Sequence, residues 1–165
     1  MPTIFKGAHF AWPLTLGIGY KTKDVVKNVT FEESCRYKIS GPDMFDINKL
    51  FGIGYFWGHH TDSARFGWRY EPEIDKIEIF AYCYVNKERV ERWLCDVRFN
   101  EQNLFGISVQ KNNYFFWVIN SNSGTPVSSE TINKDHKKKF SYSLGAYFGG
   151  DARAPHKMKI KFDKP

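Results

Sequence analysis

The segment Ser63 to Val85, SARFGWRYEPEIDKIEIFAYCYV, predicts a β-hairpin whose turn lies around Glu71-Pro72-Glu73. From Lys76 onward the residue types alternate, and a period of two is the signature of a strand. One face is small and aliphatic, which suits a packed core, and the other runs from charged to aromatic residues. The aromatic end therefore either packs beneath a loop of this chain or contacts a partner. The first face holds Ile77, Ile79, Ala81, Cys83 and Val85, and the second holds Lys76, Glu78, Phe80, Tyr82 and Tyr84.

The rest of the chain predicts further strands joined by short turns. Aromatic residues make up 18% of the sequence, and aromatic and β-branched residues favour strands. About ten short strands at this spacing indicate a sandwich or a barrel. We expect a single all-β domain over residues 1–165, an antiparallel jelly-roll sandwich of the concanavalin-like type. Besides the hairpin, the expected strands are Thr3–Trp12, Lys23–Ile39 as one long or two short strands, Asp46–Trp57, Arg89–Phe99, Leu104–Gln110, Tyr114–Asn120, Phe140–Phe148 and His156–Phe162, with Ser121–Lys139 as the longest loop.

Two details of these strands concern their faces. Gly52, Gly54 and Gly58 are spaced so that they share one strand face, and glycines in a strand permit strong curvature or the close approach of another segment. Along Arg89–Phe99 the alternation places Trp93, Cys95, Val97 and Phe99 inward.

Cysteines and histidines give no pattern of a metal or disulfide site. Cys35, Cys83 and Cys95 are odd in number and lack C-x-x-C spacing, so we expect buried free thiols made in a reducing compartment. His59 and His60 are adjacent, and neighbours on an extended segment point to opposite sides. With no phosphate-binding loop and no dinucleotide fingerprint, we expect no metal and no other cofactor.

The net charge of +6 is concentrated near the C-terminus. Residues 134–165 hold nine Lys and Arg against three Asp, a difference equal to the net charge of the whole chain. Such a segment suits an acidic protein surface or an anionic glycan; nucleic acid is not the partner we expect. The alternative is a solvated face whose lysines protect edge strands. The candidate partner-binding residues are Lys137, Lys138, Lys139, Lys157, Lys159 and Lys161.

Targeting and membrane signals are weak. No uninterrupted apolar stretch of about 18 residues is present, so we expect no transmembrane helix and no membrane partner. The N-terminal segment lacks a basic start and a small-residue cleavage site, so it is a poor signal peptide.

The hairpin contains one pattern with the form of a catalytic motif. Glu73-Ile74-Asp75-Lys76-Ile77-Glu78 is E-x-D-x-x-E and resembles the catalytic strand of family 16 glycoside hydrolases, which are concanavalin-like jelly rolls. The resemblance implies Glu73 as nucleophile and Glu78 as acid/base, a retaining pair on one face. Two departures weigh against it: Lys76 stands where the family prefers an apolar residue, and Glu73 falls in the predicted turn.

A second candidate site is a sugar-binding platform. Aromatic rings offer stacking faces for sugars, and arginines offer polar partners, although aromatic residues equally fill the core of a sandwich. The candidate ligand-binding residues are Trp57, Arg65, Trp68, Tyr82 and Tyr84, with Arg69 nearby.

Three blocks of the chain resemble uncharacterised proteins of Bacteroidetes bacteriophages, the crAss-like phages among them. They are NKLFGIGYFWGHHTDSARFGWRY, KIEIFAYCYVN and LGAYFGGDARAPHKMKI, within residues 48–162. The closing segment is also similar to concanavalin-like jelly rolls. The phage resemblance implies a non-enzymatic virion protein made in the host cytoplasm, an auxiliary or decoration protein that contacts the capsid shell and copies of itself. A carbohydrate-binding module and a glycosidase are the alternatives.

Overall fold

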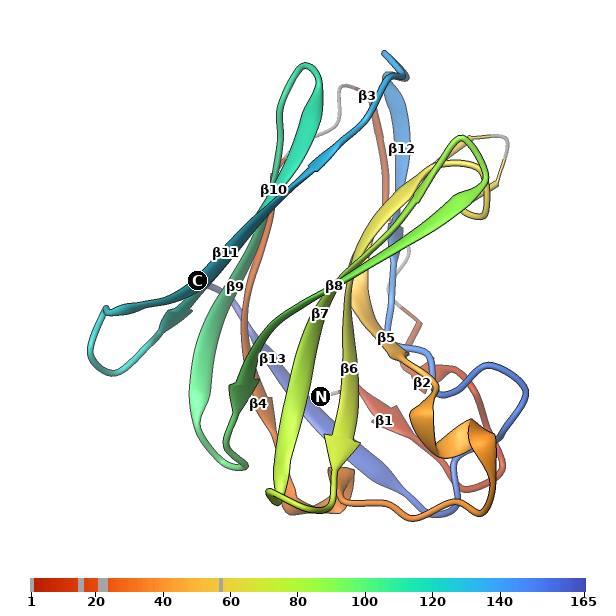
Figure 1. The fold of residues 1–165 in the computed structure, drawn as a ribbon, viewed down its shortest axis with the longest axis vertical. Helices are drawn as coiled ribbons and strands as arrows, with labels where there is room; N and C mark the ends of the chain where they lie inside the picture. The colour runs from red at the N-terminus through yellow and green to blue at the C-terminus, as the bar shows by residue number, and fades with distance from the viewer. Residues whose placement is uncertain (1, 15–16, 21–23, 57) are drawn as a thin grey trace.

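The structure is a computed structural model that describes residues 2–14, 17–20, 24–56 and 58–165. Two antiparallel sheets pack face to face (Figure 1), which confirms the predicted jelly-roll β-sandwich. In spatial order, the seven-stranded sheet contains β11 (Pro126–Asn133), β10 (Asn113–Asn120), β9 (Gln102–Val109), β4 (Val25–Phe31), β13 (Met158–Asp163), β1 (Thr3–Ile4) and β2 (Ala11–Trp12). The six-stranded sheet contains β3 (Ile18–Tyr20), β12 (Phe140–Leu144), β5 (Asn48–Tyr55), β6 (Ser63–Glu71), β7 (Lys76–Val85) and β8 (Glu88–Val97).

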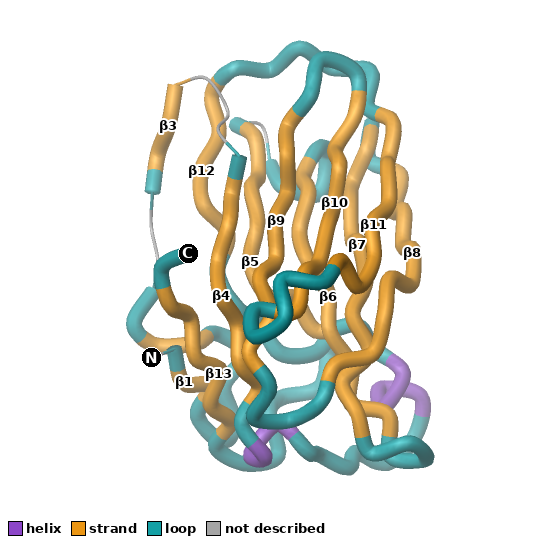
Figure 2. The backbone as a smooth tube through the Cα atoms, turned by 90° about the vertical axis from the view of Figure 1, so that its left-hand side faces the viewer, coloured by secondary structure: helices purple, strands orange, loops and turns teal. Residues whose placement is uncertain are grey.

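The core lies between the two sheets, which Figure 2 shows from the side. Ile77, Ile79, Ala81 and Cys83 of β7 belong to this core, as the alternation predicts, and Phe80 and Tyr82 are buried outside it on the other face. From β6, the Phe66 ring reaches across to the other sheet. Its centroid lies 5.1 Å from that of Phe105 and 5.2 Å from that of Phe116, edge to face, a geometry that aromatic pairs prefer.

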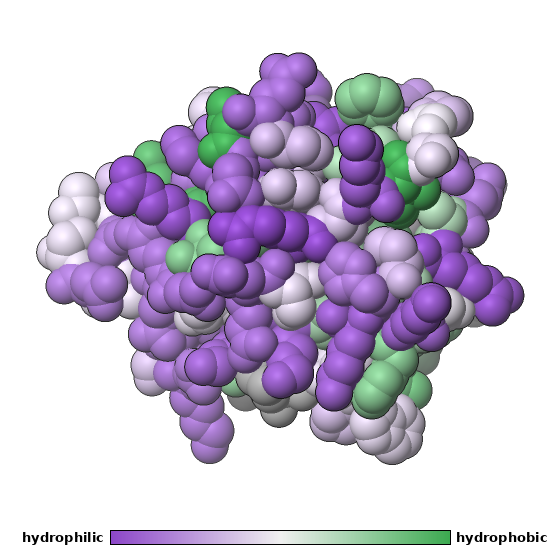
Figure 3. Space-filling view, turned by 90° about the horizontal axis from the view of Figure 1, so that it is seen from below, coloured by the Kyte–Doolittle hydropathy of each residue, from purple (hydrophilic) through white to green (hydrophobic). Residues whose placement is uncertain are grey.

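The predicted hairpin is confirmed. β6 and β7 pair from Ser63↔Tyr84 to Glu71↔Lys76, and the four residues between them form the turn. Asp75 closes this turn with a φ of 49°. The turn lies at the lower end of the sandwich in Figure 1, and Figure 3 shows that hydrophilic residues cover most of that end.

The three cysteines are free and buried, as the sequence indicates. The described residues include two short 3-10 helices, η1 (Glu33–Cys35) and η2 (Pro42–Phe45). No helix in the described ranges is long and apolar enough to cross a membrane.

In the segment predicted as one or two strands over Lys23–Ile39, β4 is followed by the 3-10 helix η1. Three further local predictions are wrong. The expected strand Thr3–Trp12 is two short strands, β1 and β2, because Gly7 turns the chain with a φ of 77°. The expected loop Ser121–Lys139 contains β11. This strand is polar because it is the edge of its sheet and forms ladder hydrogen bonds on one side only, with β10, and most of its side chains are exposed or half-buried.

The third error concerns Trp93, which is 57% exposed instead of inward. The pairing of β7 with β8 shifts register between Ile79 and Phe80, so that Ile79 faces Cys95 and Phe80 faces Trp93. The extra residue, Leu94, is buried. Such a β-bulge breaks the alternation and turns the preceding side chain outward.

Candidate functional site

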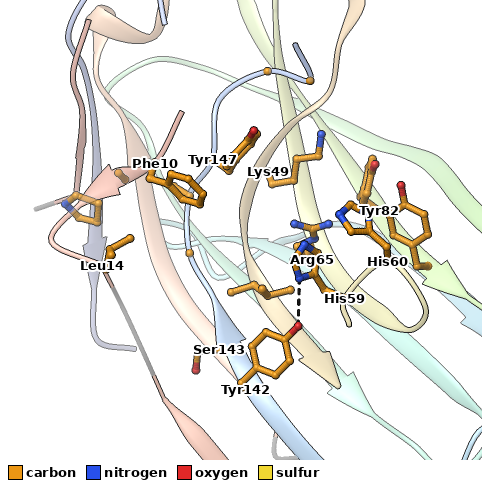
Figure 4. Close-up of a pocket in the computed structure, with 18 of the residues that line it drawn as sticks. Phe10, Leu14, Lys49, His59, His60, Arg65, Tyr82, Tyr142, Ser143 and Tyr147 are labelled. Atoms are coloured by element: carbon orange, nitrogen blue, oxygen red, sulfur yellow. Dashed lines mark hydrogen bonds between the residues drawn. The ribbon is translucent and has the colours of Figure 1, made fainter. Parts of the chain in front are cut away.

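A groove with a volume of about 620 Å³ lies on the outer face of the six-stranded sheet (Figure 4). This size is typical of a small-molecule or cofactor site. β5, β6, β7 and β12 supply its floor, and the segments around Phe10, His59 and Tyr147 supply its rim. Two rows of cross-strand neighbours contribute floor residues: Leu144, Arg65 and Tyr82 from the first row, and Tyr142, Tyr84 and Arg89 from the second.

Two glycines of β5 let side chains of the groove lie close to the sheet. A Cβ at position 52 would lie 2.6 Å from Cα of Arg65, and a Cβ at position 54 would lie 2.9 Å from Cζ of Tyr142 and 3.0 Å from Cβ of His59. Real Cβ atoms essentially never approach other atoms to less than 3.0 Å, and few come as close as 3.0 Å. Gly52 and Gly54 of the predicted glycine row therefore give the space in which Arg65, His59 and Tyr142 lie over the sheet. The prediction for Gly58 is wrong, because it lies beyond the end of β5 with a φ of 105°.

Arg65 is a buried cation that pairs with no acidic side chain of the described residues. It is 6% exposed, and its Nε is buried and makes no hydrogen bond. None of the ion pairs among the described residues involves it. Burial lowers the pKa of its guanidinium, although an arginine stays protonated at neutral pH. Because an unpaired buried charge is costly, this side chain favours an anion from outside the chain.

Lys49 adds a second positive charge. Its Nζ lies 4.9 Å from the centroid of the Tyr82 ring, and the guanidinium carbon of Arg65 lies 5.4 Å from the same centroid, within the range of cation–π contacts. Burial, with Arg65 close by, lowers the pKa of Lys49 to about 8. Arg89 is a third basic residue of the lining and pairs with Glu91 at 3.0 Å.

His59 and Tyr142 form a hydrogen-bonded pair in the groove, 3.1 Å from Nδ1 to the hydroxyl oxygen. Burial, with a smaller effect of Arg65, lowers the pKa of His59 below its ordinary value of 6.5. The imidazole is therefore neutral at neutral pH and can accept a proton.

Aromatic rings form the sides of the groove. Tyr147 stacks on His9 with centroids 5.0 Å apart, and Phe10 meets the same tyrosine edge to face. On the opposite side, the His60 ring lies edge to face on Tyr84, with centroids 5.2 Å apart. The groove thus combines basic groups on its floor with partly exposed rings at its sides.

Three of the residues predicted for a sugar platform lie together. Arg65, Tyr82 and Tyr84 all line the groove. The prediction that Trp68 belongs to this platform is wrong, because Trp68 is fully buried in the core. Residues 65 and 68 have opposite parity on β6, so they face opposite sides of the sheet. Trp57 lies outside the described residues, and Arg69 pairs with Glu78.

The residues of the E-x-D-x-x-E pattern do not line the groove. Glu73 is exposed in the turn between β6 and β7. Asp75 accepts hydrogen bonds from Arg36 at 2.7 and 2.9 Å, and Glu78 pairs with Arg69 at 2.6 Å. Two acidic residues of the pattern, Asp75 and Glu78, therefore form ion pairs with Arg36 and Arg69.

The lysines predicted to bind a partner differ in their surroundings. Lys137, Lys139, Lys157 and Lys161 are exposed, and Lys159 is half-buried. Lys138 instead donates to the buried carboxylate of Asp62 at 2.5 Å, so it is engaged within the chain. Among the described residues, no three His, Cys, Asp or Glu side chains gather to hold a metal ion.

Sequence reasoning missed Lys49, His59, Tyr142 and Tyr147 as groove residues. They come from segments up to 98 positions apart, and the order β12-β5-β6-β7 brings them together. The one signal for their meeting point was the pair Gly52 and Gly54.

Comparisons with known proteins identify the fold and no family. No family model and no curated protein matches the sequence. The alginate lyase from Klebsiella pneumoniae is similar in structure, with a TM-score of 0.62 and 11% identity over 84% of this chain. This chain spans 56% of that lyase, just over half its length. Scytalido-glutamic peptidase has a TM-score of 0.54 and 10% identity, covering 98% of this chain and 79% of its own.

Proposed function

We propose that this protein binds a polysaccharide in the groove of the six-stranded sheet. The observation that carries the proposal is Arg65, a buried cation with an unpartnered Nε on the floor of an aromatic-sided groove. Sugar rings pack their C–H faces on aromatic rings and accept hydrogen bonds from basic groups. The groove offers both, with Tyr84 and Tyr147 at its sides and Lys49 on its floor. The fold shared with an alginate lyase supports the same class of ligand.

The proposal is tested by electrophoresis of the protein through gels that contain alginate, polygalacturonate, a β-glucan or no polysaccharide. We expect at least one polymer to retard the full chain, and Tyr84→Ala to weaken that retardation. Trp93→Ala is the matched control, because Trp93 is an exposed aromatic residue that does not line the groove. Migration that no polymer changes would contradict the proposal, and so would equal losses in both variants.

The virion role implied by the phage resemblance stays a separate proposal. The exposed lysines 137, 139, 157 and 161 support it as a basic surface for an acidic shell. Co-sedimentation of the protein with phage capsids tests it. We expect binding that weakens when these four lysines are changed to glutamate, and a protein that stays in the supernatant would contradict it.

A further inference from the structure

We propose that the groove is a catalytic site for β-elimination on a polysaccharide that contains uronic acids. Arg65 would hold the sugar carboxylate, and His59 and Tyr142 would move the protons. This inference rests on the proposed polysaccharide binding and adds the substrate class and the reaction.

The charge of the groove selects the substrate class. Its described lining contains Lys49, Arg65 and Arg89 against a single acidic residue, Asp151. A guanidinium binds a carboxylate through two parallel N–H···O bonds, which makes arginine well suited to it. Arg65 has no such partner within the described chain, and the Lys49 ammonium contacts the same Tyr82 ring. A carboxylated sugar would supply the missing negative charge.

The residue types in the groove decide between two ways of breaking a glycosidic bond. Hydrolysis generally uses a pair of carboxyl groups on either side of the bond. The described lining has only Asp151 for that purpose, and Asp151 is exposed. A uronic acid has a second route, because the hydrogen on C5 is next to the carboxylate. Neutralising that carboxylate stabilises the negative charge that develops when the C5 proton leaves.

The His59–Tyr142 pair can complete this reaction without any other reagent. His59 Nε2 takes the proton from C5, the C5–H electrons form the C4=C5 double bond, and the C4–O4 bond breaks. The phenol of Tyr142 gives its proton to the departing O4. The proton on His59 Nδ1 then crosses the 3.1 Å hydrogen bond to the Tyr142 oxygen. Both residues end neutral, and the products are a 4,5-unsaturated uronate and a free hydroxyl.

The sheet places these groups close enough to act together. Tyr142 is the cross-strand neighbour of Gly54, and Arg65 is the cross-strand neighbour of Gly52, two positions along the same strand. Without side chains at 52 and 54, Arg65 and the His59–Tyr142 pair lie side by side over β5, on the wall of the groove that a sugar unit would contact (Figure 4). Arg65 also acts electrostatically on His59.

The test incubates the full chain with alginate and with polygalacturonate, each native and with its carboxyls reduced to alcohols. The readout is the ultraviolet absorbance of the new double bond conjugated with the carboxylate. We expect absorbance to rise with at least one native polymer and with neither reduced polymer. Tyr142→Phe and His59→Ala should each lower the rate at least about 100-fold, the lower range for general acid–base groups. Tyr70→Phe is the matched control, because the Tyr70 hydroxyl bonds Asp75 at the distant turn.

Each outcome decides the inference separately from the proposed function. No new absorbance from polymers that still retard the protein in gels would overturn the elimination and leave polysaccharide binding intact. A rate unchanged in both Tyr142→Phe and His59→Ala would overturn the assignment of the pair. Loss of the rate in these two variants, with gel retardation and thermal stability maintained, would support it.

Discussion

The hydroxyl of Tyr142 lies 3.1 Å from Nδ1 of His59, although 83 positions separate the two residues in the sequence. Pairing of β12 with β5 brings Tyr142 opposite Gly54, and the loop before β6 carries His59 over the same glycine. The pairing of β12 with β5 and the absence of a side chain at Gly54 therefore allow His59 and Tyr142 to form a hydrogen bond in the groove that also holds Arg65.

Gly54→Ala is expected to push this pair apart. The new Cβ would lie 2.9 to 3.0 Å from Tyr142 and His59, and overpacking of this kind costs roughly 1–3 kcal/mol. We expect a lower melting temperature and weaker polysaccharide binding. Gly19→Ala is the control, because its Cβ would meet Ser141 Oγ at 3.9 Å, an ordinary contact. Equal effects of the two substitutions on binding would contradict the role of Gly54.

Arg65→Met is expected to make the unliganded protein more stable and to abolish binding of anionic polysaccharide. The substitution removes a buried, unsatisfied Nε–H, whose burial costs about 1–3 kcal/mol, and keeps a long apolar side chain. Urea unfolding measures the free energy. Arg69→Met is the control and should be destabilising, because it leaves Glu78 without its ion-pair partner. A binding-competent Arg65→Met variant would contradict the anion site.

Affinity for an anionic polysaccharide is expected to fall as the pH rises from 7 to 9. Lys49 has a pKa of about 8, lowered by burial and by Arg65, with Asp46, Glu91 and Arg89 also acting on it. Below this pKa the ammonium is charged and attracts the ligand, and above it the amine is neutral. Losing one partly screened ion pair weakens binding by about 1 kcal/mol, roughly fivefold. Lys49→Arg should remove this pH dependence, which binding titrations at the two pH values would show.

The rate of elimination is expected to be insensitive to pH just above 6.5 and to fall in more acidic solution. His59 must be neutral to accept the C5 proton, and burial, Arg65 and His60 all lower its pKa from 6.5. The acidic limb of the rate profile should therefore have its midpoint below that value. A midpoint above 6.5 in initial-rate measurements would contradict His59 as the base.

Asp62→Ala is expected to destabilise the protein by about 2–3 kcal/mol, near the lower end of the range for breaking a buried ion pair. The Asp62 carboxylate is buried, accepts the Lys138 ammonium and the backbone N–H of Asn86, and lies 3.9 Å from His136. Lys138 is partly exposed, which moderates the loss. Asp75→Ala, at an exposed pair with Arg36, should change the unfolding midpoint little. Equal midpoints for both variants would contradict this assignment.

The sequence predicted the sandwich because the β7 alternation is unbroken, and it predicted Arg65, Tyr82 and Tyr84 as candidate ligand residues. The prediction that Trp68 binds ligand was wrong. Trp68 and the core residue Phe66 are two positions apart on β6 and so share its inward face, and the sequence alone shows this spacing. The predicted inward orientation of Trp93 was wrong because the bulge residue Leu94 reverses the alternation of faces along β8. Nothing in the residue types around Leu94 indicates this bulge. The strand β11 was predicted as part of a loop, because its polar sequence is that of an edge strand, which needs few apolar residues.

The groove as a whole was out of reach of sequence reasoning. Lys49, His59 and Tyr142 meet only because β12 pairs with β5 and not with a neighbour in the sequence. Periodicity gives the faces of strands but not their order in a sheet. Gly52 and Gly54 indicated where other side chains could pack closely on β5, but the sequence did not show which side chains these are.

The most direct test of the groove as an anion-binding polysaccharide site is the nuclear magnetic resonance signal of the Arg65 Nε–H, assigned through Arg65→Lys. We predict that oligomers of uronic acid will shift this signal saturably, and that neutral oligosaccharides of equal length will not, because the carboxylate binds this guanidinium. An Arg65 signal that stays fixed while uronate oligomers shift residues elsewhere would contradict the account.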